Sequence, residues 1–153
     1  MEANSSAPIR IVLADQDPLY DHAFIIRTEV FVEEESVDQE DEYDGFDHLS
    51  HHYLAFYQDQ AAGTARWRTM PSTGRIRLER FAVLKRFRKL GVGTALMEHI
   101  LSQIPGQGEV FIHSQVENKA FFERFGFQIS GEPFEEAGIQ HFEMKLPADR
   151  KVL

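Results

Sequence analysis

The stretch Leu78-Glu79-Arg80-Phe81-Ala82-Val83-Leu84-Lys85-Arg86-Phe87-Arg88-Lys89-Leu90-Gly91-Val92-Gly93-Thr94-Ala95-Leu96-Met97 runs from a strand-like segment, through a basic turn, into an amphipathic helix. Gly91 and Gly93 carry no side chain that could keep a ligand away from the backbone. The helix that follows begins with N–H groups that lack intrahelical partners, and with a partial positive charge. This arrangement predicts a binding site for a phosphate group.

The spacing of the two glycines excludes two common phosphate loops. A P-loop needs four residues between its glycines and then Lys with Ser or Thr, and a dinucleotide fingerprint needs a third glycine where Leu96 stands. What is left is Arg88-x-x-Gly91-x-Gly93 between a strand and a helix. This pattern resembles the acetyl-CoA pyrophosphate loop of the GNAT N-acetyltransferase superfamily.

Further segments support that resemblance. The stretch from Asn118 to Phe127 resembles, in shortened form, a second GNAT signature in which an Asn precedes a helix rich in aromatic residues. The chain is also similar to the ElaA/YjcF-like branch of the superfamily over residues 26–144. The residues that carry this likeness are Arg27–Glu35, Leu78–Arg80, His113–Gln115 and Ala137–Met144. The branch implies no particular acceptor.

The pattern along the chain predicts a mixed α+β (α/β) fold with the element order β, α, β, β, β, α, β, α, β, which is also the GNAT order. We expect a central, mostly antiparallel sheet flanked by helices. Residues 1–8 are predicted to be a tail, 9–147 one GNAT acetyltransferase domain, and 148–153 a second tail. The predicted strands are 9–13, 53–57, 62–68, 75–83, 110–112 and 139–146; the predicted helices start at Asp17, Thr94 and Asn118, with Asp17 and Asn118 as caps.

Composition narrows the class of protein. The chain has 153 residues, 42% of them hydrophobic, which suits one domain with a core. Its net charge of -9 argues against a nucleic-acid partner. No apolar segment reaches the roughly 20 residues that cross a bilayer, and no signal peptide is evident, so we expect a cytoplasmic protein without a membrane partner. The absence of cysteine excludes a thiolate nucleophile and a cysteine-bound zinc.

Two other patterns are weighed and set aside. His48, His51 and His52 lack a clear fourth ligand, so no metal is predicted. The acidic stretch 33–47 fails as a calcium loop because His51 stands where a Glu is needed. Its carboxylates are read as a solvated surface or as an acidic lip that attracts cationic amines, and Arg27 either lies on a helix surface or pairs with this stretch.

The resemblance implies an N-acetyltransferase. Acetyl-CoA is the expected co-substrate, and its acetyl group would pass directly to a primary amine of a small molecule, or less readily of a protein, in a ternary complex. A homodimer is expected only by analogy. Because Phe122 stands where many GNAT enzymes carry a tyrosine that serves as the general acid, a module that senses CoA with little turnover is the alternative.

The same resemblance assigns residues to roles. The strand backbone at Phe81, Ala82 and Val83 would lie along pantetheine, and the Val83 amide is the candidate oxyanion donor. The full set of expected cofactor contacts is Phe81, Ala82, Val83, Arg88, Lys89, Leu90, Gly91, Val92, Gly93, Thr94, Asn118, Phe121, Phe122 and Arg124.

Three residues are candidates for the general base. Glu79 precedes the pantetheine strand, with an ion pair to Arg77 or Arg80 as its alternative role, and His113 and His141 are the rivals because imidazole titrates near neutral pH. The expected acceptor contacts are Arg27, His52, Glu79 and His141.

Overall fold

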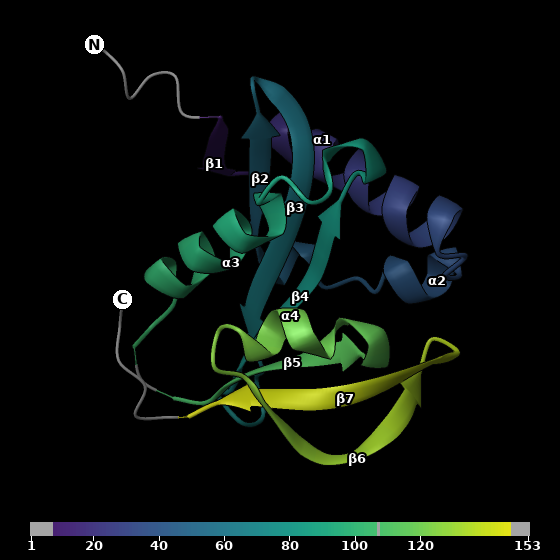
Figure 1. Cartoon of the computed structure of the whole chain (residues 1–153), viewed down its shortest axis with the longest axis vertical. Coiled ribbons are helices and arrows are strands. Elements are labelled where there is room, and N and C mark those ends of the chain that lie inside the picture. The colour runs from purple at the N-terminus through teal and green to yellow at the C-terminus, as the bar shows by residue number, and fades with distance from the viewer. Residues whose placement is uncertain (1–7, 107, 148–153) are drawn as a thin grey trace.

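The computed structural model describes residues 8–106 and 108–147, so the predicted tails, apart from Pro8, lie outside the described residues. A seven-stranded sheet has the strand order β1-β2-β3-β4-β5-β7-β6 (Figure 1). Neighbouring strands are antiparallel except β4 and β5, which are parallel. The strands are β1 Ile9–Leu13, β2 His51–Tyr57, β3 Gln60–Thr69, β4 Ile76–Val83, β5 Val110–Gln115, β6 Gln128–Glu136 and β7 Ile139–Leu146. The predicted α+β fold with a mostly antiparallel sheet is confirmed.

Helices cover both faces of the sheet. They are α1 Leu19–Arg27, which continues as a π-helix over Thr28–Glu34, then α2 Gln39–Glu42, α3 Val92–Gln103 and α4 Lys119–Glu123. On β2, the ring of His52 contacts Tyr20 near the start of α1, whereas the ring of the next residue, Tyr53, contacts His99 of α3. Because successive strand residues point to opposite faces, α1 and α3 lie on opposite sides of the sheet.

Among the described residues, no helix is long and apolar enough to span a membrane.

The start of α3 packs closely against β3. The helix starts at Val92, two residues before the predicted Thr94. A Cβ on Gly63 of β3 would lie 2.9 Å from Cγ1 of Val92 and 3.0 Å from the carbonyl oxygen of Ala82, so a glycine lets the helix start press against β3. Leu96, Met97 and Ile100 then bury one face of the helix.

Three details of the prediction are wrong. The amino-terminal helix ends as a regular α-helix at Arg27, and its continuation is a π-helix. Asp17 is not the N-cap of α1, because Pro18 holds that position; Asn118 is the N-cap of α4 as predicted, but it makes no side-chain capping bond. Strand β6 is absent from the predicted elements.

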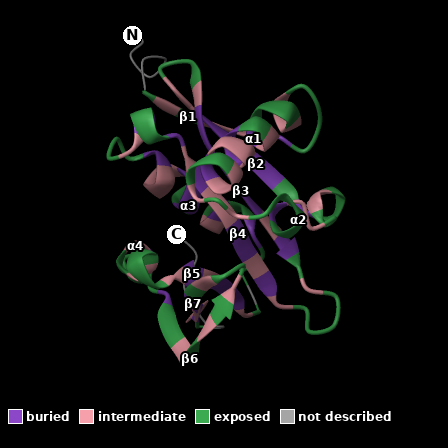
Figure 2. Ribbon diagram, turned by 90° about the vertical axis from the view of Figure 1, so that its right-hand side faces the viewer, coloured by how far each residue is buried: buried purple, intermediate pink, exposed green. Residues whose placement is uncertain are grey.

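Strand β6 was missed because it lies at the edge of the sheet and is mostly exposed, so it has no apolar alternation (Figure 2). It also contains Gly131 and Pro133, which are uncommon inside strands, and its register with β7 shifts between Ser130 and Phe134. The turn to β7 is Ala137-Gly138, with φ of 53° and 79°. Two residues with positive φ are the pattern of a tight type I′ hairpin turn.

Candidate active site

The sheet opens between its two parallel strands. β4 and β5 pair only at Ile76 with Val110 and at Arg77 with Phe111, and then separate. Strand β4 also has a bulge on its other side, where it pairs with β3. Arg66 of β3 faces Glu79 and Thr64 faces Ala82, and Arg80 lies within the bulge with a φ of 60°. A cleft therefore opens beside the second half of β4, and two pockets lie along it.

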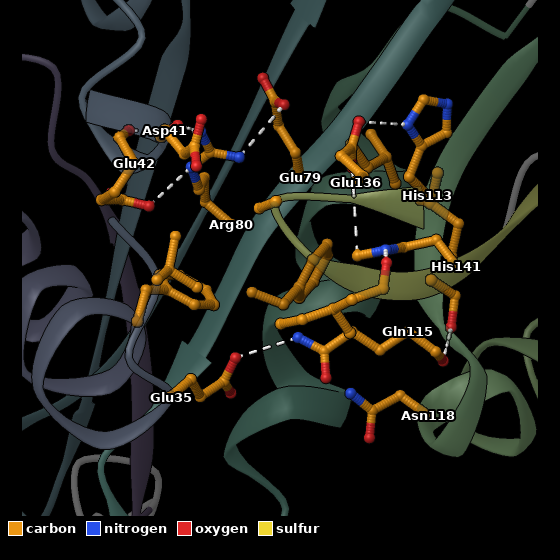
Figure 3. Close-up of a pocket in the computed structure, with 18 of the residues that line it drawn as sticks. Glu35, Asp41, Glu42, Glu79, Arg80, His113, Gln115, Asn118, Glu136 and His141 are labelled. Atoms are coloured by element: carbon orange, nitrogen blue, oxygen red, sulfur yellow. Dashed lines mark hydrogen bonds and ion pairs between the residues drawn. The ribbon is translucent and has the colours of Figure 1, made fainter. Parts of the chain in front are cut away.

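The first pocket has a volume of about 240 Å³ and lies among β4, β5, the β6–β7 turn and the segment after α1 (Figure 3). Apolar side chains of Phe31, Val37, Phe81 and Phe122 form part of its wall. The polar residues that line it are Glu35, Asp41, Glu42, Arg77, Glu79, Arg80, His113, Ser114, Gln115, Asn118, Glu136 and His141.

The second pocket is formed by the glycine loop. Gly91 precedes α3 with φ of 90°, in the left-handed region that glycine adopts without strain. A Cβ on Gly93 would lie 3.4 Å from the ring of Phe121, so α4 packs directly against the first turn of α3. The residues that line this pocket are Val83, Phe87, Arg88, Lys89, Gly91, Val92, Gly93, Thr94, Phe121 and Arg124.

The backbone at the end of β4 also faces the cleft. The N–H of Leu84 donates to the carbonyl oxygen of Ala62 at 2.9 Å, on the β3 side. Since successive N–H groups of a strand point to opposite edges, the N–H of Val83 points toward the cleft. Its carbonyl oxygen accepts a hydrogen bond from Nε of Arg88 at 2.8 Å, which agrees with this orientation.

His141 lines the first pocket, and one of its ring nitrogens can accept a proton. Its Nδ1 lies 2.7 Å from the carbonyl oxygen of Ile139, and because a carbonyl only accepts, Nδ1 carries the proton. Nε2 therefore holds a lone pair in the neutral ring, 4.0 Å from Oε1 of Glu136. The residue is 8% exposed.

His113 is more fully engaged. Its Nδ1 lies 3.1 Å from both Glu136 Oε2 and Arg77 Nη2, and its Nε2 lies 3.3 Å from Glu143 Oε1. The hydrogen bond from His113, with the charge of Arg77, lowers the pKa of Glu136 to about 2. Glu136 is therefore an anion near neutral pH, between the two histidines (Figure 3).

Comparison with known proteins identifies this architecture. The family model for the acetyltransferase (GNAT) domain matches residues 17–148. The chain belongs to the GNAT acetyltransferase family.

The chain is similar to the uncharacterized protein YyaT of Bacillus subtilis, with 35% identity over 85% of this chain and 90% of that protein. It is also 31% identical to the N-acetyltransferase YjcF of the same organism, over 89% of this chain and 98% of the relative. The fold is that of Escherichia coli ElaA, with a TM-score of 0.79 at 23% identity, over 91% and 99% of the two chains. The resemblance to the ElaA/YjcF-like branch is confirmed, and the chain is an acetyltransferase.

Most of the cofactor residues expected of a GNAT enzyme lie along the cleft. Those in the loop pocket are Val83, Arg88, Lys89, Gly91, Val92, Gly93, Thr94, Phe121 and Arg124, and those in the first pocket are Phe81, Asn118 and Phe122. Two lie in neither pocket: Ala82 is buried in the core and Leu90 is exposed. Among the described residues, no group of three or more histidine or carboxylate side chains is placed to hold a metal ion.

Glu79 has the alternative role, that of an ion-pair partner. Its carboxylate lies 2.8 Å from both Arg66 and Arg68, 3.2 Å from Arg77 and 3.7 Å from Arg80. Burial by itself would raise the pKa of Glu79, but the surrounding arginines hold that pKa below its ordinary value. A carboxylate held by four cations is a weak proton acceptor, which argues against Glu79 as the base.

Two of the predicted acceptor contacts, Arg27 and His52, do not reach the first pocket. Each is 1% exposed and lies outside the first pocket. Arg27 bonds to Glu42 at 2.6 Å and to Asp47 at 2.7 Å, which confirms its pairing with the acidic stretch. His52 bonds through Nε2 to the carbonyl oxygen of Asp47 at 2.9 Å.

The acidic stretch is also less solvated than expected. Asp44 and Asp47 each lie 2.6 Å from Arg66, and Glu42 lies 2.9 Å from Arg80. These carboxylates bind arginines that project from β3 and β4 and thereby fix the segment over the sheet. The prediction of a solvated surface is wrong for these three residues, because the sequence does not show that Arg66 is fully buried.

Acid should weaken this network. Burial would raise the pKa of Asp47, but Arg27 and hydrogen bonds from Tyr20, Arg27 and Arg66 lower it from 3.8 to about 2. A carboxyl whose pKa is lowered by folding contributes stability above its unfolded pKa, and loses that contribution as pH falls through the folded value. We expect Asp47→Asn to cost about 2 kcal/mol at pH 7 and much less at pH 2.5.

Urea unfolding at the two pH values measures this difference. Asp41→Asn is the matched control, because Asp41 is exposed and its carboxylate has no ion pair among the described residues. A cost for Asp47→Asn that does not change between pH 7 and pH 2.5 would contradict the ionic role of Asp47.

Proposed function

We propose that this GNAT enzyme transfers the acetyl group of acetyl-CoA directly to a primary amine of a small molecule while both are bound in the cleft between β4 and β5. The observation that carries the proposal is the placement of two pockets along one cleft: the glycine loop forms one, and His141 lines the other. The loop pocket would bind the pyrophosphate and the first pocket would receive the amine.

Pocket size favours a small acceptor. The first pocket, at about 240 Å³, is smaller than the roughly 300–1,000 Å³ typical of sites for drug-sized ligands. Its carboxylates and the lone pair of His141 also suit an ammonium group.

The proposed reaction begins with proton transfer from the ammonium to Nε2 of His141. Of the three predicted bases, His141 has a nitrogen that is not engaged by an arginine or a close carboxylate. The charge of Glu136 would stabilise the imidazolium that forms.

Acetyl transfer then follows at the thioester. The amine nitrogen bonds to the thioester carbon, and the N–H of Val83 would donate to the oxyanion that develops. The carbonyl re-forms as the carbon–sulfur bond breaks, and the electron pair leaves with sulfur as CoA thiolate. Phe122 cannot donate a proton, but a thiol with an ordinary pKa of about 8.5 is a tolerable leaving group without assistance.

Incubation with acetyl-CoA and a panel of amines tests this function. We expect free CoA thiol above the amine-free background with at least one polyamine, amino sugar or other small amine, and weaker release with peptides. Silence across the whole panel would contradict the proposed function. Release that is strongest with peptides would move the acceptor class to proteins.

Glu136→Gln should change the pH dependence of the reaction. A charge about 4 Å away is worth about 1 kcal/mol even in water, so its loss should remove stabilisation of the imidazolium and move the acidic limb of kcat/KM to lower pH. The control is Glu135→Gln on the same strand, an exposed residue outside the pocket. An acidic limb that is identical in both variants would contradict a charge effect of Glu136 on the base.

A further inference from the structure

The loop pocket contains an arginine that is already occupied by a carboxylate. Arg88 donates from Nη1 and Nη2 to the two oxygens of Glu34, at 2.6 Å and 2.7 Å, and donates from Nε to the carbonyl oxygen of Val83. This pairing lowers the pKa of Glu34 and raises that of Arg88. Both terminal nitrogens of Arg88 are thus bonded to Glu34, the last residue of the π-helix.

The next residue ties the same segment to the other side of the cleft. Oε1 of Glu35 accepts a hydrogen bond from Nε2 of Gln115, at the end of β5, at 3.0 Å (Figure 3). Arg88 follows β4, whereas Gln115 ends β5. Two adjacent glutamates therefore bond to both sides of the cleft: Glu34 to Arg88, which follows β4, and Glu35 to Gln115, which ends β5.

Carboxylate and phosphate compete for the same arginine geometry. A guanidinium presents parallel N–H groups that match two oxygens of either anion. A pyrophosphate that entered the loop pocket would meet Arg88 with those N–H groups already used. It would also meet the negative charge of Glu34.

We propose that Glu34 is a built-in competitor for the phosphate groups of acetyl-CoA, bound to Arg88 in the free protein and displaced from it when the cofactor binds. This inference rests on the proposed function, because it takes the loop pocket as the pyrophosphate site. Glu34 then sets the affinity for the cofactor without taking part in the chemistry. Removal of its charge should tighten binding.

Calorimetric titration with CoA, which binds without turnover, tests the proposal. For Glu34→Gln we expect a Kd about threefold lower than that of the wild type, as for the loss of one exposed ion pair. The matched control is Glu33→Gln, which removes the same charge one residue earlier. Glu33 is exposed and forms no ion pair among the described residues, so its Kd should stay at the wild-type value.

A double-mutant cycle assigns the effect to the pair. In an Arg88→Met background, Glu34→Gln should change the CoA Kd much less, because the partner that Glu34 competes for is absent and only the screened charge repulsion between Glu34 and the phosphates remains. An unchanged or higher Kd for Glu34→Gln, an equal gain for Glu33→Gln, or a gain of the same size without Arg88 would each overturn the competitor role. If the wild type binds no CoA, the proposed function itself fails and the competitor role fails with it.

Discussion

Gly91→Asp is expected to weaken acetyl-CoA binding by about 100-fold or more, since it adds a carboxylate at the pyrophosphate site and a side chain where φ is positive. The substitution should not prevent folding, because among the described residues a Cβ at Gly91 would meet only Ile9, with Cδ1 at 3.7 Å. Calorimetric titration with acetyl-CoA measures the effect.

Gly74→Asp is the matched control for Gly91→Asp. Gly74 also has a positive φ, of 73°, and a Cβ there would have no heavy atom of the described part of the chain within 4 Å. It lies in the turn between β3 and β4, outside both pockets. The two variants share the added charge and the backbone strain, so only the anion site separates them. Equal affinities for acetyl-CoA in both would refute the assignment of the glycine loop.

His141→Ala is expected to lower the rate of acetyl transfer by about 10²-fold or more, the usual contribution of a positioned general base. Its Kd for CoA should stay near the wild-type value, because the residue lies outside the loop pocket. Thiol release at saturating acetyl-CoA measures the first quantity, and calorimetry measures the second.

The control for His141→Ala is His22→Ala, an exposed histidine on α1 that lies outside both pockets. It should retain the wild-type rate and pH profile. If His141→Ala keeps a rate within about threefold of the wild type, below the usual range for a general base, the base would have to be sought elsewhere, first at His113.

The glycine loop could be predicted from sequence because its function depends on neighbours in the chain. Gly91, Gly93 and the start of α3 lie within a few residues of one another, and the backbone itself forms the site. Strands β2 and β3 were recognisable for the same reason, since each is a short apolar segment and the two are joined directly by a turn.

The acceptor side could not be predicted in the same way. Glu136 was missed because it lies on β6, an exposed edge strand with a glycine and a proline. A signal was present: if Ala137-Gly138 had been taken as a two-residue hairpin turn, Glu136 would pair with Ile139 and lie close to His141. Alanine is an unusual residue at such a turn, and this obscured the hairpin.

Long-range ion pairing was the other source of error. Glu79 stands at the strand position expected of a base. Its carboxylate, however, is bound by two arginines on β3 as well as by its neighbours in sequence. Arg27 and His52 were placed at the acceptor site by resemblance, whereas the fold of the acidic stretch buries them. Sequence distance conceals such contacts, since Arg27 and Glu42 are 15 residues apart.

The most direct test of direct acetyl transfer is the initial rate of CoA thiol release over a grid of acetyl-CoA and amine concentrations, with the best amine of the panel. Transfer in a ternary complex predicts almost no release without amine, and double-reciprocal lines that intersect. Parallel lines, the sign of an acetylated enzyme intermediate, or release that does not depend on the amine would contradict this account.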